Sequence, residues 1–175
     1  MENHIEGLVL KEDEGVRVVR TGDLVVKKVF GKNEGFCRLL KYNPEEIVSR
    51  EIRALKLLEG LEGIQRFSCS LEKNKMVTRY VQGKHLGKYE KEELPFGYFE
   101  ALEGLVMQCN SRGVYRVGSK QDFLITPEGK PAIIDFGSVL FDDDSLLKIP
   151  GVKRIVKHRV MSKLKRMKRE FYRAP

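Results

Sequence analysis

The sequence predicts an α+β fold, with an antiparallel sheet first and helices in most of the remainder. Residues 5–30 alternate apolar and polar side chains in three short runs, which glycine-containing turns separate. Apolar side chains then recur at helical spacing over 44–59 and 94–112. Two short apolar runs around a Pro-Glu-Gly turn, within residues 123–134, predict a late hairpin.

The composition is typical of a soluble globular domain. The chain has 175 residues, of which 41% are hydrophobic and 33% charged, and this length suits one domain with a core. No apolar run approaches the roughly 18–20 residues that a membrane span needs, and the acidic N-terminus lacks a signal-peptide pattern. Three scattered cysteines without metal-ligand spacing predict reduced thiols and a cytoplasmic location.

The third predicted strand, residues 24–30, carries a pair of lysines. Strand alternation places Val26 and Lys28 on one face and Lys27 on the other. A strand lysine is usually a solvated residue at a sheet edge, and that interpretation stays open for Lys28. The single turn glycines nearby do not form a glycine-rich phosphate loop.

The first predicted helix carries a glutamate with two interpretations. Asn43, followed by a proline and two acids, predicts the start of the helix. Glu51 lies among basic neighbours, so it is either half of an i,i+4 surface pair or the counter-charge of a buried lysine. Two further strands are predicted after this helix, at 67–71 and 76–83, with a charged turn between them.

The rest of the chain is organised around the stretch from Gly113 to Ser138. Gly113 ends the second predicted helix, and a polar loop then leads into the hairpin. Antiparallel strands bring the entry and exit of a hairpin to one edge, so Asp122 and Asp135 should be neighbours. A turn cap and a surface charge would explain such a pair, whereas two carboxylates also suit Mg²⁺.

Asp135-Phe-Gly, which follows an apolar strand, resembles the metal-binding segment of protein kinases. The loop that begins at Tyr115 falls where those kinases carry His-Arg-Asp, and Asp122 stands at the position of their Asn. Together with the strand lysine, the helix glutamate and a hinge-like strand, this order makes residues 5–141 resemble a minimal protein-kinase-like fold. The resemblance is to the small bacterial and archaeal RIO-like and lipopolysaccharide-kinase-like serine/threonine kinases.

This resemblance implies an antiparallel N-lobe sheet with one helix and a truncated helical C-lobe with a hairpin. The corresponding division is 1–83 for the N-lobe, 84–147 for the C-lobe and 148–175 for a basic amphipathic C-terminal helix. It also implies that the protein binds ATP and Mg²⁺.

The resemblance assigns roles to individual residues. Lys28 would hold the nucleotide phosphates, with Glu51 as its partner. Thr78 would be the gatekeeper, and the backbone of Arg79 and Val81 would face adenine. The residues implied to bind the nucleotide are Val26, Lys28, Glu51, Thr78, Arg79 and Val81, and those implied to bind the metal are Asp122 and Asp135.

The departures from the kinase pattern concern catalysis. Val117 stands where the family carries its catalytic Asp, and valine can neither accept a proton nor orient a hydroxyl. Asp122 replaces Asn, and Lys120 is the remaining candidate for a catalytic role in this loop. The resemblance therefore implies a kinase-family phosphotransferase with impaired or atypical catalysis. A non-catalytic pseudokinase that scaffolds a protein partner is one alternative, and an RNA- or ribosome-associated protein is another.

The positive charge of the protein is concentrated in its C-terminal segment. Residues 148–175 hold eleven Lys or Arg and one acid, a net charge of +10, whereas the whole chain carries +8. Val156, Val160, Leu164 and Met167 recur at three to four residues, which predicts an amphipathic basic helix. Such a helix could be a solvated face, or it could dock on the body, on an anionic membrane surface or on RNA.

Overall fold

The computed structural model confirms the predicted α+β class, with an antiparallel sheet near the N-terminus, helices and a late hairpin. The structure describes residues 7–12, 15–30, 42–90, 93–115 and 119–173. The chain divides into two compact units. Unit 1 comprises Met1–Glu59, Gln65–Tyr80 and Phe136–Ser138, and unit 2 comprises Gly60–Ile64, Val81–Asp135 and Val139–Pro175.

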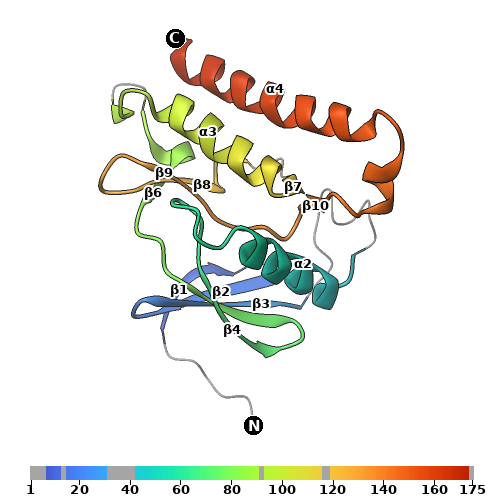
Figure 1. The fold of residues 1–175 in the computed structure, drawn as a ribbon. Helices are drawn as coiled ribbons and strands as arrows, with labels where there is room; N and C mark the ends of the chain where they lie inside the picture. Colours follow the sequence, from blue (N-terminus) through green and yellow to red (C-terminus); the bar gives the residue numbers. More distant parts are fainter. Residues whose placement is uncertain (1–6, 13–14, 31–41, 91–92, 116–118, 174–175) are drawn as a thin grey trace. The chain divides into compact units, whose positions relative to one another are not determined.

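Unit 1 is built on a five-stranded antiparallel sheet in the order β1-β2-β3-β5-β4 (Figure 1). Its strands are β1 (Leu8–Glu12), β2 (Val16–Thr21), β3 (Leu24–Val29), β4 (Phe67–Glu72) and β5 (Lys75–Arg79). The three N-terminal strands pair in sequence order, which confirms the predicted meander. The central strand is β3, and its pairing with both β2 and β5 fixes the strand that carries the two lysines.

One helix, α2 (Pro44–Leu57), packs on this sheet. It starts as predicted, because Asn43 Oδ1 accepts from the Glu46 N–H at 2.8 Å and the Glu46 carboxylate accepts from the Asn43 N–H at 2.9 Å. This reciprocal cap satisfies two backbone donors that a helix start would otherwise leave unpaired. The buried face of α2 consists of Ile47, Val48, Glu51, Ala54 and Leu55.

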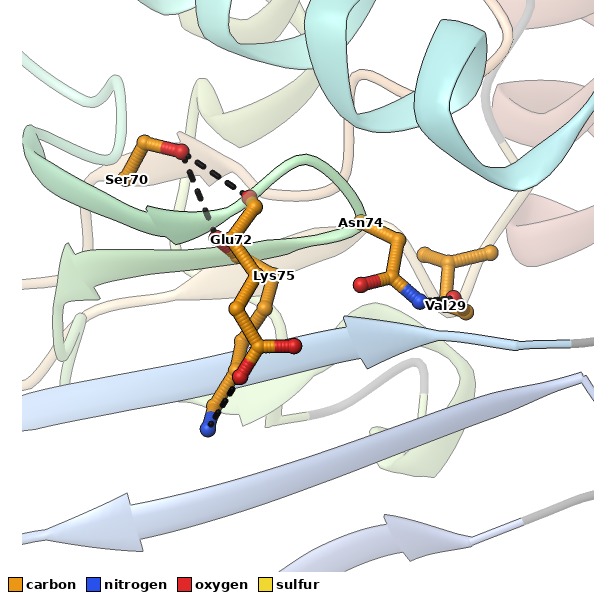
Figure 2. Close-up of polar contacts among 5 residues, drawn as sticks. All are labelled: Val29, Ser70, Glu72, Asn74 and Lys75. Atoms are coloured by element: carbon orange, nitrogen blue, oxygen red, sulfur yellow. Dashed lines mark hydrogen bonds and ion pairs between the residues drawn. The ribbon is translucent and has the colours of Figure 1, made fainter.

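The turn between β4 and β5 also fixes the end of β3. The amide of Asn74 donates to the carbonyl of Val29 at 2.8 Å, and the Val29 N–H donates to the Asn74 carbonyl at 2.9 Å. Within the turn, Ser70 Oγ donates to the carbonyl of Glu72 at 3.1 Å, and Lys75 Nζ lies 3.4 Å from Glu72 Oε1 (Figure 2). The Asn74–Val29 bonds continue the pairing of β3 with β5 beyond the last ladder pair, and the other contacts hold the hairpin together.

Unit 2 contains the predicted hairpin, formed by β8 (Phe123–Ile125) and β9 (Pro131–Ile133). A short strand, β6 (Lys84–His85), pairs with β8 to give a three-stranded sheet, and the short helix η1 (Leu86–Lys88) follows it. A second, two-stranded sheet joins β7 (Val114–Tyr115) to β10 (Leu140–Phe141). The chain then passes through η3 (Ser145–Lys148) into the C-terminal helix α4 (Val152–Tyr172).

The other long helix of unit 2, α3 (Tyr98–Ser111), begins four residues later than its apolar periodicity predicts. Gly97 takes the left-handed conformation, with φ 75°, so the helix starts after it. Phe96, predicted on the apolar face of this helix, is consequently fully exposed. Gly113, with φ 75°, follows the C-cap as predicted. None of the helices in the described part of the chain is long and apolar enough to span a membrane.

The segment Gly60–Ile64 pairs with the hairpin and requires glycine at one position. The N–H of Ile133 donates to the carbonyl of Gly63 at 2.7 Å, and Ile64 forms a parallel bridge with Ile133. A Cβ at Gly63 would lie 2.5 Å from the carbonyl oxygen of Pro131, and the φ of Gly63 is 83°. Gly60 has the same φ but open space around its Cβ position.

Gly63→Ala should therefore destabilise the protein more than Gly60→Ala does. Both alanines carry the cost of a left-handed backbone, about 1–2 kcal/mol, and only the alanine at position 63 also meets a carbonyl oxygen, which adds about 1–3 kcal/mol. Urea unfolding of the two variants measures the difference. Equal free energies of unfolding would mean that the segment moves away from β9 at little cost.

Candidate functional site

The carboxylate of Glu51 is the most unusual group of unit 1, because it is ionisable and only 1% exposed. Lys27 Nζ lies 2.6 Å from its Oε2, which makes an ion pair between β3 and α2. The backbone N–H of Phe136 donates to its Oε1 at 3.2 Å. Both carboxylate oxygens therefore have partners inside unit 1, and these partners offset the loss of hydration that burial imposes.

The partner of Glu51 is Lys27, and the prediction that Lys28 forms this ion pair is wrong. Val25 and Val29 are buried, and strand alternation puts Lys27 on their face of β3, where α2 packs. Lys28 lies on the opposite face and is partly exposed. The sequence alone fits either lysine, because adjacent residues of a strand point to opposite faces. The buried Val25 and Val29 decide that Lys27, and not Lys28, faces α2.

The hairpin places Asp122 and Asp135 at one edge, as the antiparallel pairing requires. The N–H of Ile134 donates to the carbonyl of Asp122 at 3.0 Å, so the residue before Asp135 is bonded directly to Asp122. Asp122 Oδ2 accepts from the backbone N–H of Ser119 at 2.5 Å and from its hydroxyl at 2.9 Å. One carboxylate oxygen of Asp122 thus shapes the loop that enters the hairpin.

Asp135 has an uncommon backbone conformation for a residue with a side chain. Its φ is 63°, and it is the one non-glycine residue with positive φ in the described part of the chain. Aspartate adopts the left-handed region more readily than most residues with a side chain. The conformation still costs free energy at Asp135 that it would not cost at a glycine. No group of three or more His, Cys, Asp or Glu side chains gathers as a metal site among the described residues.

The predicted gatekeeper is buried in unit 1 and bonded to a residue that the sequence did not single out. Thr78 is 1% exposed, and its Oγ1 accepts from Gln65 Nε2 at 2.7 Å. The same amide lies 3.2 Å from the carbonyl of Arg79, whose N–H donates to the carbonyl of Arg66 at 2.8 Å. The N–H of Arg79 is therefore already hydrogen-bonded to Arg66, whereas the Arg79 carbonyl oxygen, which accepts from Gln65, has a second lone pair.

The remaining predicted site residues that the structure describes are placed as follows. Val26 lies on the Lys28 face of β3, and Val81 follows β5; both are partly exposed. Lys120 Nζ lies 3.4 Å from Glu170 Oε2 and 5.8 Å from the centre of the Phe171 ring. The ammonium group that was a candidate for catalysis thus contacts α4.

A polar cluster holds the start of the catalytic-type loop. The Tyr115 hydroxyl donates to Asp142 Oδ1 at 2.7 Å, and Lys153 Nζ lies 2.7 Å from the same oxygen. Hydrogen bonds from Lys153 and then Tyr115 lower the pKa of Asp142, and burial, followed by Asp142, raises the pKa of Tyr115. Val117, the predicted departure from the kinase pattern, lies outside the described residues.

Comparison with known proteins agrees with this architecture. The chain is 32% identical over 135 residues to CBL-interacting protein kinase 9 of Oryza sativa subsp. japonica. The matched region is 71% of this chain and 28% of that protein. It is 32% identical over 136 residues to CBL-interacting serine/threonine-protein kinase 15 of Arabidopsis thaliana, covering 73% and 31%. No family model matches the chain.

A solved structure of similar fold is the Rio2 kinase–ADP/Mg²⁺–phosphoaspartate complex from Chaetomium thermophilum. Its TM-score is 0.67 over 91% of this chain and 54% of that chain, with 15% sequence identity. The chain belongs to the protein-kinase-like superfamily. This kinase-like chain spans less than a third of the length of the two plant kinases, so the likeness covers part of each relative.

The buried ion pair of the kinase-like chain yields a stability prediction. Lys27→Met leaves the Glu51 carboxylate without its counter-charge and should cost about 3–5 kcal/mol. Lys28→Met, the matched change on the opposite face, should stay within about 0.5 kcal/mol. Adding Glu51→Gln to Lys27→Met should recover part of the loss, because the amide still accepts from Phe136. Urea unfolding measures all three variants, and equal effects of the two lysine changes would contradict the assignment.

Proposed function

We propose that this kinase-like protein binds ATP together with Mg²⁺, through Lys27 for the phosphates and Asp135 and Asp122 for the cation. The observation that carries the proposal is the Glu51 carboxylate, which is buried and holds the Lys27 ammonium at 2.6 Å. The Lys27 side chain is 12% exposed, and its contact with a buried carboxylate holds the ammonium group in a fixed place. This arrangement orients a cation for a phosphate more tightly than a solvated lysine would.

The residues present fit the chemistry of the two ligands. Mg²⁺ prefers hard oxygen ligands, and Asp122 and Asp135 bring two carboxylates to one hairpin edge. Bound Mg²⁺ would neutralise phosphate charge, while the protein positions the groups. We also propose that the backbone of Val81 and the carbonyl of Arg79 face adenine beside Thr78. Val26, which the sequence predicted to contact the nucleotide, lies on the face of β3 opposite Lys27 and is left out of this site.

For catalysis we propose a serine/threonine-kinase-family phosphotransferase with impaired or atypical activity. Val117 supplies no carboxylate at the position of the catalytic Asp, and Lys120 is engaged by Glu170. The alternative is a non-catalytic pseudokinase that scaffolds a protein partner, and the two differ in whether phosphoryl transfer occurs at all. The division at residues 83 and 147, a cytoplasmic location and an anionic partner for the basic tail belong to the same proposal.

Nucleotide binding is tested by calorimetric titration of Mg·ATP into the wild type and three variants. Lys27→Arg keeps a charge beside Glu51 but changes the donor geometry, so affinity should fall about tenfold or more, equivalent to about 1.4 kcal/mol. Asp135→Asn should lower the affinity for Mg·ATP more than that for ATP in EDTA. Lys28→Gln is the matched control and should bind as the wild type does.

Unchanged Mg·ATP affinity in both Lys27→Arg and Asp135→Asn would refute the proposed site. A loss in Lys28→Gln of the same size as in Lys27→Arg would show that the phosphates are held on the other face of β3.

The role of position 117 is tested by restoring the acid. Val117→Asp should raise phosphoryl transfer or ATP hydrolysis by about 10²–10⁴-fold, the usual contribution of a positioned base. Radiolabelled ATP measures the turnover, and Val117→Asn, similar in size but unable to accept the proton, is the control. Wild-type turnover at ordinary kinase rates with no gain in Val117→Asp would mean that another residue supplies the base.

A further inference from the structure

The apolar face of α4 is already occupied within unit 2. Val160, Leu164 and Met167 are buried, and the helix packs on α3. The ring of Phe99, on α3, lies 5.9 Å from that of Phe171 at an edge-to-face angle. In Figure 1 the two helices run alongside each other. The amphipathic pattern seen in the sequence is therefore explained by packing inside the protein.

Some of the cations of α4 are neutralised on the side that faces the body of unit 2. Lys153 pairs with Asp142 at 2.7 Å, and Lys168 pairs with Glu100 of α3. Glu170, the one acid of the helix, is shared between Lys120 and Arg166. These pairs fix how the helix is rotated about its axis, and that rotation determines which cations point outward.

Five cations of α4 are exposed without an ion-pair partner among the described residues, and one of them, Lys157, lies 5.7 Å from the centre of the Tyr115 ring. We call the other four the outer basic face. They are Arg154, Arg159, Lys165 and Arg169. At 100° per residue all four lie on the half of the helix opposite Val160 and Leu164. The rise of 1.5 Å per residue gives the face a length of about 22 Å from its first to its last member.

The chemistry of this face selects its partner. A helix that inserts into a membrane interface needs its apolar stripe, and here α3 covers that stripe. A protein partner is usually anchored by a cluster of buried aromatic or aliphatic groups, whereas the exposed large apolar side chains on the outer half of α4 are Ile155 and Tyr172, which lie far apart along the helix. Single-stranded nucleic acid is typically held by stacking on aromatic rings, and Tyr172 is instead in edge contact with Phe99.

We infer that the outer basic face of α4 binds the phosphate backbone of duplex nucleic acid without reading its sequence. A rigid row of long cationic side chains suits regularly spaced phosphates, and its affinity arises from counterion release. Four neutralised phosphates predict a slope of about −3.6 for log K against log salt with duplex DNA. This inference selects among the anionic partners proposed above and is independent of nucleotide binding.

Fluorescence anisotropy with the full chain tests the inference, using a labelled duplex of about 20 base pairs, longer than the 22 Å face at 3.4 Å per base pair. The test variant replaces Arg154, Arg159, Lys165 and Arg169 with Gln, a good helix former. The control replaces Lys11, Arg66, Lys73 and Lys88 with Gln, four exposed cations on other elements. Both variants lose four charges, so only the position of the charges differs between them.

We expect the test variant to lose at least tenfold in affinity for duplex RNA and duplex DNA, and its salt slope to approach zero. The control should keep the wild-type slope, and both variants should keep the wild-type thermal transition and Mg·ATP affinity. Equal losses in the two variants, tighter binding of single-stranded RNA, or binding of phosphatidylserine vesicles alone would each overturn the inference. Loss of Mg·ATP binding with normal duplex binding would affect only the proposed function.

Discussion

Unit 1 depends on a single buried charge. A carboxylate that is 1% exposed has lost nearly all its hydration, and it is tolerated only because Lys27 and the Phe136 N–H satisfy its oxygens. Removing Lys27 would take away the counter-charge of the buried carboxylate, and losing the Phe136 N–H would take away a hydrogen bond to its other oxygen. Strand β3, helix α2 and the Phe136 segment are therefore coupled through this carboxylate. A hydrophobic residue at position 51 could pack there without this demand. The sequence instead keeps a carboxylate that holds the Lys27 ammonium at 2.6 Å.

This demand explains several features of the surrounding sheet. The amide of Asn74 and the carbonyl of Val29 extend the pairing of β3 beyond its ladder, which limits fraying two residues after Lys27. The reciprocal cap at Asn43 fixes where α2 begins, and therefore which of its turns brings Glu51 to the sheet. The Lys27–Glu51 ion pair is short, at 2.6 Å, so it requires the strand and the helix both to be held in place, and these two contacts hold them.

The sequence could predict those parts of the fold that local chemistry decides. The cap at Asn43, the turn at Gly113 and the hairpin edge shared by Asp122 and Asp135 each follow from backbone rules that act within a few residues. The choice between Lys27 and Lys28 could not be predicted, because a run of valines around two lysines has no clear phase until α2 covers one face. Resemblance to kinases then favoured the wrong neighbour.

Other parts of the candidate site depend on contacts between residues distant in sequence. Gln65 reaches Thr78 across 13 positions, and Tyr115 reaches Asp142 across 27, and nothing in the local pattern marks either pair. The tail illustrates the same limit. The spacing of its apolar residues predicted an amphipathic helix. Only the packing on α3 shows that the apolar half of the helix is buried inside unit 2 and that the charged half stays exposed.

Asp135 combines a chemical and a conformational constraint at one residue. Its positive φ is a conformation in which glycine would be less strained, and the chain nevertheless carries a carboxylate there. The backbone on either side is fixed, since Ile134 is bonded to Asp122 and Phe136 to Glu51. Neighbours that determine the backbone this fully can hold a residue in a costly conformation. The proposed binding of a cation by the Asp135 carboxylate would account for a side chain kept in this conformation at the hairpin edge.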